Sequence, residues 1–183
     1  MTTKKYAALL RGINVGGAKK VPMAELREVL AGLGHTDVQT YLQSGNAVFA
    51  STQKDTAALA RELEQAVEAR FGFTVACLVV DGARLRAVAE ACPFPSAELE
   101  GRQLHATFLS EQPADERFAS IDGPSYLPEE YRIGDRVVYL YTPDGLGRSK
   151  LAEALFKPAV FKGIDATTRN WNTVARLVEL TED

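Results

Sequence analysis

The order in which apolar spacing changes along the chain constrains its fold more than any other feature of this sequence. Short apolar runs that alternate or continue, as in β-strands, occupy residues 5–11, 38–42, 47–50 and 73–80. Apolar side chains recur every three to four positions, as in helices, over residues 22–34 and 56–71. The resulting order is β-α-β-β-α-β, which predicts an antiparallel sheet with two helices on one face. The continuously apolar run 73–80 further predicts a strand in the centre of that sheet.

The same order recurs in the second half of the chain. The predicted elements are a strand at 103–109, a short helix from Pro113, strands at 130–133 and 136–141, a helix at 149–156 and a strand at 165–169. An extra helix at 82–91 and a closing helix at 172–180 complete the pattern. We therefore predict an α+β protein with two ferredoxin-like subdomains in tandem and a C-terminal helix. The predicted domains are 1–92, with the extra helix, and 103–183, joined by a Pro-rich linker at 93–102.

Composition predicts a protein that folds without disulfides or a structural metal ion. The chain has 183 residues, of which 46% are hydrophobic, enough to bury a core without disulfides or metal. It contains no apolar run of about 20 residues and no secretion signal at its start, so we expect a cytoplasmic protein without a membrane partner. Cys77 lies in an apolar run and is predicted to be buried, reduced and not bonded to Cys92. No metal site is predicted, because the cysteines and histidines are far apart in sequence.

The first polar segment joins the first predicted strand to the first helix. It reads RGINVGG from Arg11 to Gly17 and runs into Lys19 and Lys20. Backbone N–H groups of such a segment at a helix start can cradle an anion, so we interpret it as a candidate ligand loop. The glycine spacing is not a dinucleotide fingerprint, and no Gly-Lys-Ser/Thr follows as in a P-loop. A connection that needs left-handed backbone is the structural alternative.

Residues 40–46 and 143–150 are the second and third polar segments. The first of these is a predicted hairpin, and its Ser-Gly-Asn tip is also what a tight turn alone requires. The second, PDGLGRSK, places Arg148, Ser149 and Lys150 at a helix start, which suits a phosphate or carboxylate. A capping serine flanked by solvated charges is the structural alternative.

The fourth polar segment covers residues 167–173 and holds the only tryptophan of the chain. Its structural alternative is capping of the last helix by Asn170 or Thr168. A Trp beside Arg169 and an asparagine suits stacking on a base or ring, and it equally suits anchoring of the last helix in the core.

Catalytic constellations are poor in this sequence. His35 and His105 are interpreted as structural or surface residues, and no nucleophile-elbow or paired-histidine motif is present. Ser149 and Lys150 are adjacent, so they do not share a helix face as a Ser/Lys dyad would. A catalytic base would be a carboxylate such as Asp144, which its spacing does not single out. The sequence leaves open whether the protein is an enzyme and which cofactor, if any, it uses.

The polar segments together predict a ligand site between the two subdomains. Its residues are Arg11, Asn14, Ser44, Asn46, Arg148, Ser149, Lys150, Arg169, Asn170 and Asn172. The preferred hypothesis is a protein that binds an anionic small molecule or nucleotide. The alternatives are an enzyme acting on a phosphorylated or nucleotide substrate, an RNA-contacting module and a protein-interaction module. Nucleic acid is not favoured as a partner, because the net charge of the chain is −3 and its strands lack an aromatic-rich stacking surface.

Four of these motifs in combination carry a resemblance to a known family. RGINVGG, TYLQSGNAVF, PDGLGRSK and TTRNWNTV resemble the bacterial domain-of-unknown-function 1697 (DUF1697) family, with similarity spread from about Lys5 to Leu180. The resemblance implies a single unit of two ferredoxin-like subdomains and implies no activity. One departure is residues 157–163, which are longer and more irregular than expected before the ATTRN segment.

Overall fold

A computed structural model describes residues 1–183 and contains two four-stranded antiparallel sheets. The chain divides into two compact units. Unit 1 comprises Met1–Arg86 with Leu177–Asp183, and unit 2 comprises Ala87–Arg176. This division runs through helix α3 (Gly82–Glu90) and helix α5 (Trp171–Leu180), whereas the predicted domain boundaries lie in the segment after α3. The architecture is the predicted one, two ferredoxin-like subdomains in tandem with a C-terminal helix.

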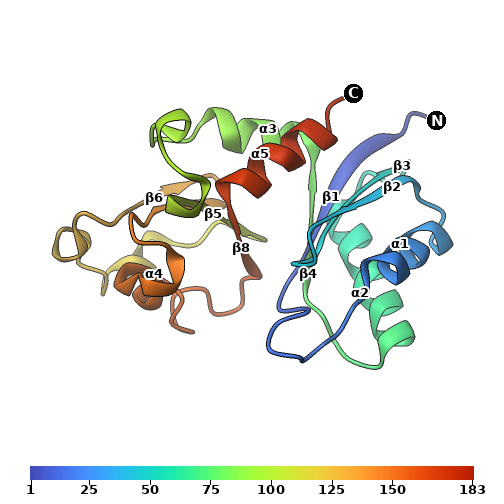
Figure 1. Cartoon of the computed structure of the whole chain (residues 1–183), viewed down its shortest axis with the longest axis horizontal. Helices are drawn as coiled ribbons and strands as arrows, with labels where there is room; N and C mark the ends of the chain where they lie inside the picture. Colours follow the sequence, from blue (N-terminus) through green and yellow to red (C-terminus); the bar gives the residue numbers. More distant parts are fainter. The chain divides into compact units, whose positions relative to one another are not determined.

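Unit 1 has the predicted β-α-β-β-α-β order. Its elements are β1 (Lys4–Leu10), α1 (Met23–Gly32), β2 (Thr36–Tyr41), β3 (Asn46–Ser51), α2 (Thr56–Phe71) and β4 (Cys77–Asp81). The strands form sheet 1 in the order β2-β3-β1-β4, and each neighbouring pair is antiparallel. Figure 1 shows α1 and α2 on the same face of this sheet. Strand β1 is antiparallel to β3, so the end of β1 lies beside the start of β3. The loop after β1 and the β2–β3 hairpin therefore meet at one end of sheet 1.

The core of unit 1 lies between sheet 1 and its two helices. Because side chains alternate along a strand, Tyr6 and Ala8 of β1 face the helices and pack with Leu30 and Leu63. Asp55 caps α2 by accepting hydrogen bonds from the backbone N–H groups of residues 57 and 58, at 3.0 and 3.1 Å.

The prediction that residues 73–80 form a central strand is wrong. Strand β4 begins only at Cys77 and lies at the edge of sheet 1, beside β1. Its apolar character has another cause, since Cys77 and Val79 are buried on the helix side and Val80 is buried on the other face. Cys77 is buried and unoxidised, and Cys92 is also free, as predicted.

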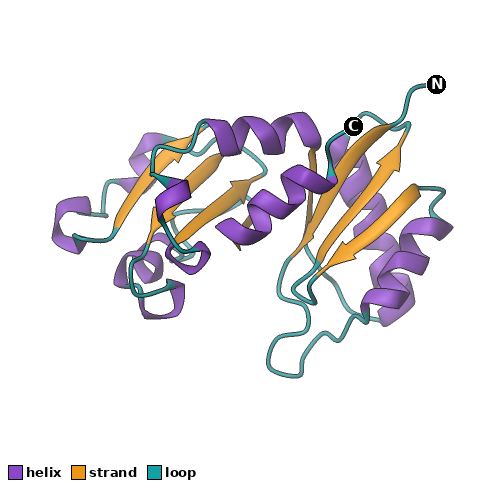
Figure 2. Ribbon diagram, turned by 45° about the horizontal axis from the view of Figure 1, so that its top comes forward, coloured by secondary structure: helices purple, strands orange, loops and turns teal.

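Unit 2 contains a second sheet with the same strand arrangement. Its strands are β5 (Leu104–Leu109), β6 (Glu130–Gly134), β7 (Val137–Tyr141) and β8 (Ala166–Asn170), in the order β6-β7-β5-β8. Helix α4 (Lys150–Leu155) is short, and the remaining helical turns are 3₁₀: η1 (Ser96–Glu98), η2 (Gly101–Gln103), η3 (Asp115–Phe118), η4 (Gly123–Tyr126) and η5 (Leu146–Arg148). Figure 2 shows these short turns around the strands of unit 2.

The helix predicted from Pro113 is a single 3₁₀ turn, so sheet 2 does not carry two α-helices on one face. Isolated turns this short cannot repay the cost of helix nucleation and commonly adopt the 3₁₀ form. Phe118 and Ile121, which follow Pro113, are nevertheless both buried in the core with α4.

The two faces of sheet 2 are covered by different elements. Val138 and Leu140 of β7 pack with α4 in one core, whereas Tyr139 points to the opposite face. There the Tyr139 hydroxyl donates a 2.7 Å hydrogen bond to the Val88 carbonyl, and its ring lies 6.4 Å from that of Trp171. Trp171 therefore anchors the start of α5 in the core of unit 2, which is the structural alternative for this residue.

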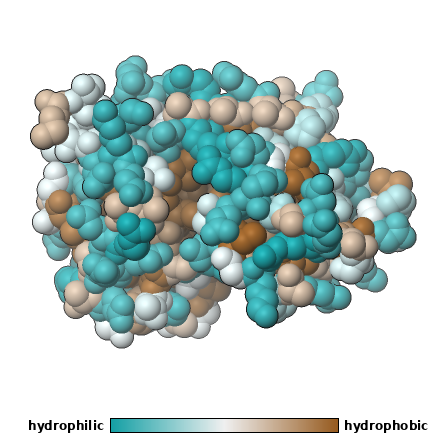
Figure 3. All heavy atoms as spheres, turned by 180° about the vertical axis from the view of Figure 1, so that it is seen from behind, coloured by the Kyte–Doolittle hydropathy of each residue, from teal (hydrophilic) through white to brown (hydrophobic).

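In the face drawn in Figure 3, hydrophilic residues make up most of the visible atoms. None of the helices combines the length and apolar character needed to cross a membrane.

Candidate functional site

Two loops of unit 1 are joined by hydrogen bonds at one end of its sheet. We call residues 11–22 and 42–45 together the loop end. The backbone N–H of Leu10 donates to the Gly45 carbonyl at 2.8 Å, and the Asn14 amide donates to the Gln43 carbonyl at 2.8 Å. The loop after β1 and the β2–β3 hairpin are thereby held as one surface.

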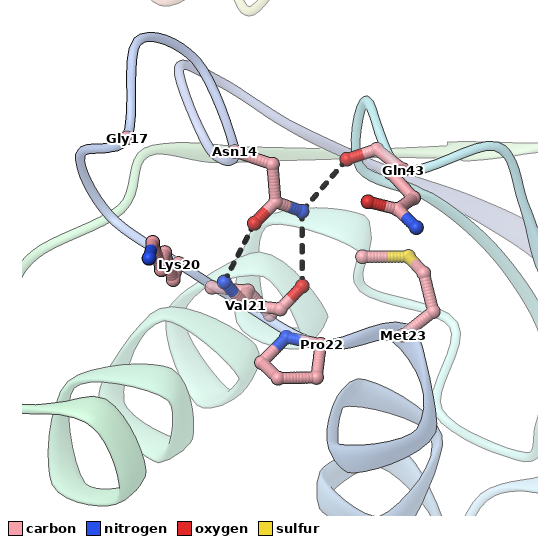
Figure 4. Close-up of a pocket in the computed structure, with 7 residues that line it drawn as sticks. All are labelled: Asn14, Gly17, Lys20, Val21, Pro22, Met23 and Gln43. Carbon is pink, nitrogen blue, oxygen red and sulfur yellow. Dashed lines mark hydrogen bonds between the residues drawn. The ribbon is translucent and has the colours of Figure 1, made fainter.

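Asn14 is the residue that holds this surface together. Its Nδ2 also donates to the Val21 carbonyl at 2.9 Å, and its Oδ1 accepts from the Val21 N–H at 2.8 Å (Figure 4). Its backbone adopts a left-handed φ of 56°, which asparagine tolerates better than most residues. Both polar ends of the Asn14 amide are therefore occupied by backbone groups, so this predicted ligand contact has a structural role.

The other predicted residues of unit 1 divide into buried and exposed ones. Asn46 is fully buried and donates to the Tyr41 carbonyl at 3.0 Å and to the Ser44 hydroxyl at 3.1 Å. Ser44 and Arg11 are exposed, and the backbone N–H of Arg11 donates to the Ala76 carbonyl at 2.9 Å. The structure thus brings these residues to the same edge of unit 1 while using Asn46 to build the turn.

A pocket of about 420 Å³ opens in this loop end, at the N-terminus of α1. It is lined by Asn14, Gly17, Lys20, Val21, Pro22, Met23 and Gln43 (Figure 4). Pro22 precedes the first residue of the helix, and no side chain caps this end. The first backbone N–H groups of α1 therefore have no intrahelical or capping partner beside the pocket, and they carry the positive end of the helix dipole.

The loop end is cationic although the whole chain is acidic. Its residues include Arg11, Lys19 and Lys20 and no Asp or Glu. Lys19 is tied down, because its ammonium group donates to the Thr74 carbonyl at 2.8 Å. Lys20 is exposed and contributes to the pocket wall. The nearest carboxylate along α1, that of Glu25, forms an ion pair with Arg70.

Two aliphatic side chains of the loop end face solvent. Val15 is 68% exposed and is bridged to Ala18 across a tight turn in which Gly16 and Gly17 have φ of 61° and 78°. Both glycines occupy left-handed backbone, which residues with a Cβ rarely adopt. Leu42 is 55% exposed and has a φ of 57°, an unusual combination for a leucine.

In unit 2, the predicted phosphate-binding segment has a capping role. Ser149 is buried and caps α4 by accepting a 2.9 Å hydrogen bond from the Ala152 N–H. Its hydroxyl donates a hydrogen bond to the Glu129 carboxylate. A carboxylate at this position disfavours an anion. Arg148 and Lys150 flank the capping serine and are exposed, in agreement with the structural alternative.

The last polar segment is also used within the fold. Asn170 caps α5 by accepting from the Thr173 N–H at 3.0 Å. Arg169 is buried in β8 and donates to the Thr167 hydroxyl at 2.8 Å and to the Thr168 carbonyl at 3.0 Å. Asn172 is exposed and packs against Gly101, where a Cβ would approach its amide to about 2.3 Å.

Unit 2 does not gather its predicted residues on one surface. Arg169 pairs in register with Ala106, on the sheet face that carries Tyr139, whereas Ser149 caps the helix on the opposite face. The joining of the unit 1 and unit 2 residues into one site therefore remains a prediction.

The sequence and the structure both match known proteins. A family model described as protein of unknown function (DUF1697) matches residues 3–139, which include the first two motifs quoted above. The chain belongs to the DUF1697 family. A conserved bacterial protein, SP0830 from Streptococcus pneumoniae, has a similar solved structure, with a TM-score of 0.79 and 26% identity over 99% of this chain and 100% of that one. None of the curated proteins matches the sequence.

The pocket of this DUF1697 member includes residues that the sequence did not single out. Lys20, Met23 and Gln43 line it together with the predicted Asn14. A usable signal was present, since Lys20 stands two positions before Pro22, the residue that precedes α1, and cations beside a helix N-terminus favour anions. The part played by Gln43 depends on the hydrogen bond from Asn14, 29 positions earlier, and no local pattern indicates it.

Proposed function

We propose that this DUF1697 protein binds a small anionic molecule, such as a phosphate monoester or nucleotide, in the pocket of its loop end. The observation that carries the proposal is the coincidence of a ligand-sized pocket with Lys20 and an uncapped helix N-terminus. Its volume of about 420 Å³ lies in the range of small-molecule sites.

The electrostatics of the loop end favour an anion. The uncapped N–H groups at the start of α1 are hydrogen-bond donors, and the helix dipole adds a partial positive charge there. Lys20 supplies a full charge on a flexible stem, and Glu25 is neutralised by its ion pair with Arg70. An anion would replace water at these donors without the burial of an opposing charge.

The mixed character of the wall supports a ligand with an organic part. Val21, Pro22 and Met23 provide apolar surface, and the Gln43 amide offers a donor and an acceptor on the other side of Asn14 (Figure 4). An anionic group at the helix start and an apolar or ring-bearing group along Met23 would use both kinds of surface.

Titration of the purified protein with inorganic phosphate, pyrophosphate and AMP tests the proposal. A probe at about 100 times its Kd should raise the free energy of unfolding by about 2.7 kcal/mol and Tm by several degrees. The Lys20→Gln variant should bind about 10- to 100-fold more weakly, because it loses a charge-assisted hydrogen bond.

Lys54→Gln is the matched control. Lys54 is exposed and follows β3, whose other end carries the loop end, so this substitution removes the same charge far from the pocket. The proposal fails if none of the three probes shifts Tm, or if Lys20→Gln and Lys54→Gln bind with equal affinity.

A further inference from the structure

A polar cluster in unit 2 takes no part in the proposed function. We call it the His105 cluster, and it comprises Glu129, Thr142, Ser149, His105 and Asn170. These residues lie at one end of sheet 2, on the face covered by α4. His105 pairs in register with Asn170 on β8 and with Leu140 on β7, and Leu140 belongs to the core around α4.

Two buried polar atoms of this cluster have no partner within the protein. They are Nδ1 of His105 and Oγ1 of Thr142. The His105 side chain is 7% exposed and that of Thr142 is 1% exposed. Buried polar atoms without a hydrogen bond are rare in folded proteins, and each costs about 1–3 kcal/mol. A pair of them at the same end of one sheet face calls for a common cause.

The register places His105 and Thr142 near each other on one face of sheet 2. The backbone N–H of Thr142 donates to the Gln103 carbonyl at 2.7 Å, so Thr142 lies opposite Gln103, two positions before His105. Diagonal neighbours of this kind on adjacent antiparallel strands face the same side, with Cα atoms about 7–8 Å apart. One small group between them can therefore reach both atoms.

Several of the neighbouring polar atoms already have partners. The Ser149 hydroxyl donates to Glu129 and accepts from the N–H of Ala152, and the Asn170 carbonyl oxygen accepts from the N–H of Thr173. These side chains do not satisfy His105 or Thr142. Because neither atom has a hydrogen-bond partner within the protein, we look for one outside the chain.

We propose that one internal water molecule bridges His105 Nδ1 and Thr142 Oγ1. Water can donate or accept, so it satisfies either tautomer of the imidazole and either orientation of the hydroxyl. An anion fits less well, because the Glu129 carboxylate lies in the same cluster and burial lowers the pKa of His105 to about 4, which leaves the ring neutral at pH 7. Neutral water introduces no further charge beside the Glu129 carboxylate.

The Thr142→Val variant of the full chain tests the proposal by urea unfolding. If water fills the site, the valine removes one of its partners and leaves His105 Nδ1 poorly satisfied, so the unfolding equilibrium constant should rise about tenfold. If the site is dry, the valine removes an unpaired hydroxyl, and the constant should stay unchanged or fall.

Thr107→Val calibrates the measurement. Thr107 is fully buried on the same sheet, and its hydroxyl shares a 2.8 Å hydrogen bond with Thr168, so its loss shows what a satisfied threonine contributes. A crystal structure of the unmodified protein should in addition show one water within hydrogen-bond distance of both His105 Nδ1 and Thr142 Oγ1. A Thr142→Val protein as stable as the parent, or density for a larger solute in place of water, would overturn the proposal.

Discussion

Acidification should destabilise unit 2 through the single buried imidazole of His105. The imidazole is 7% exposed in the core beside α4, and burial lowers its pKa from 6.5 to about 4. In the unfolded chain the same ring regains its ordinary pKa. The folded protein therefore resists a proton that the unfolded chain accepts readily.

The sign and size of the effect follow from this difference. Between pH 6.5 and about 4 the unfolded state binds more protons than the folded state, so stability falls as the pH falls through this window. The gap of about 2.5 pKa units corresponds to about 3 kcal/mol, complete only below the folded pKa. Because domains of this size have only about 5–15 kcal/mol of stability, such a loss is large.

Trp171 makes the measurement specific to unit 2. It is the only tryptophan of the chain, and its ring lies 6.4 Å from that of Tyr139 in the core of this unit. Urea unfolding followed by Trp171 fluorescence at several pH values between 7 and 4 should show the loss of stability. The His105→Gln variant should lack that part of the pH dependence, while carboxylates titrate alike in both proteins.

His35→Gln is the matched control, since His35 is the only other histidine. Burial lowers its pKa too, and Glu62 opposes that shift, but His35 packs on Phe49 in unit 1, outside the region that Trp171 reports. If the parent protein and His105→Gln lose stability equally between pH 6.5 and 4, the buried imidazole is not the cause and the reasoning is refuted.

Three further predictions concern backbone and capping positions, and each is checked by urea or thermal unfolding. Gly45→Ala should destabilise the protein by more than about 2 kcal/mol, because the added Cβ would lie 2.9 Å from Leu10 of β1. Gly34→Ala, with a similar φ but open space around it, should cost only about 1 kcal/mol. Equal losses would show that left-handed strain alone matters. Asp55→Ala should cost about 1 kcal/mol by uncapping α2, and an unchanged midpoint would contradict the cap. Gly101→Ala should displace the Asn172 amide and destabilise unit 2, and the added substitution Asn172→Ala should recover most of that loss; additive effects would argue against the contact.

Local signals in the sequence determined the elements of this protein. Apolar spacing predicted the order of the strands in both units and the two helices between the strands of unit 1. The Ser-Gly-Asn turn was readable because it depends on residues within a few positions. These signals reflect steric and hydrogen-bonding preferences that already act in a short peptide.

Tertiary structure decided which face each element covers and which polar side chains are left for a ligand. Strand β4 was predicted to be central because its residues are continuously apolar, but burial on both faces, and not neighbours on both edges, explains that composition. Similarly, Ser149 was predicted to contact a ligand, but its hydroxyl donates a hydrogen bond to Glu129, 20 positions earlier. The pocket beside Lys20 depends on Asn14 reaching Gln43 across 29 positions. Such contacts form only when the whole unit packs, because their partners are set by chain topology and not by local sequence preference.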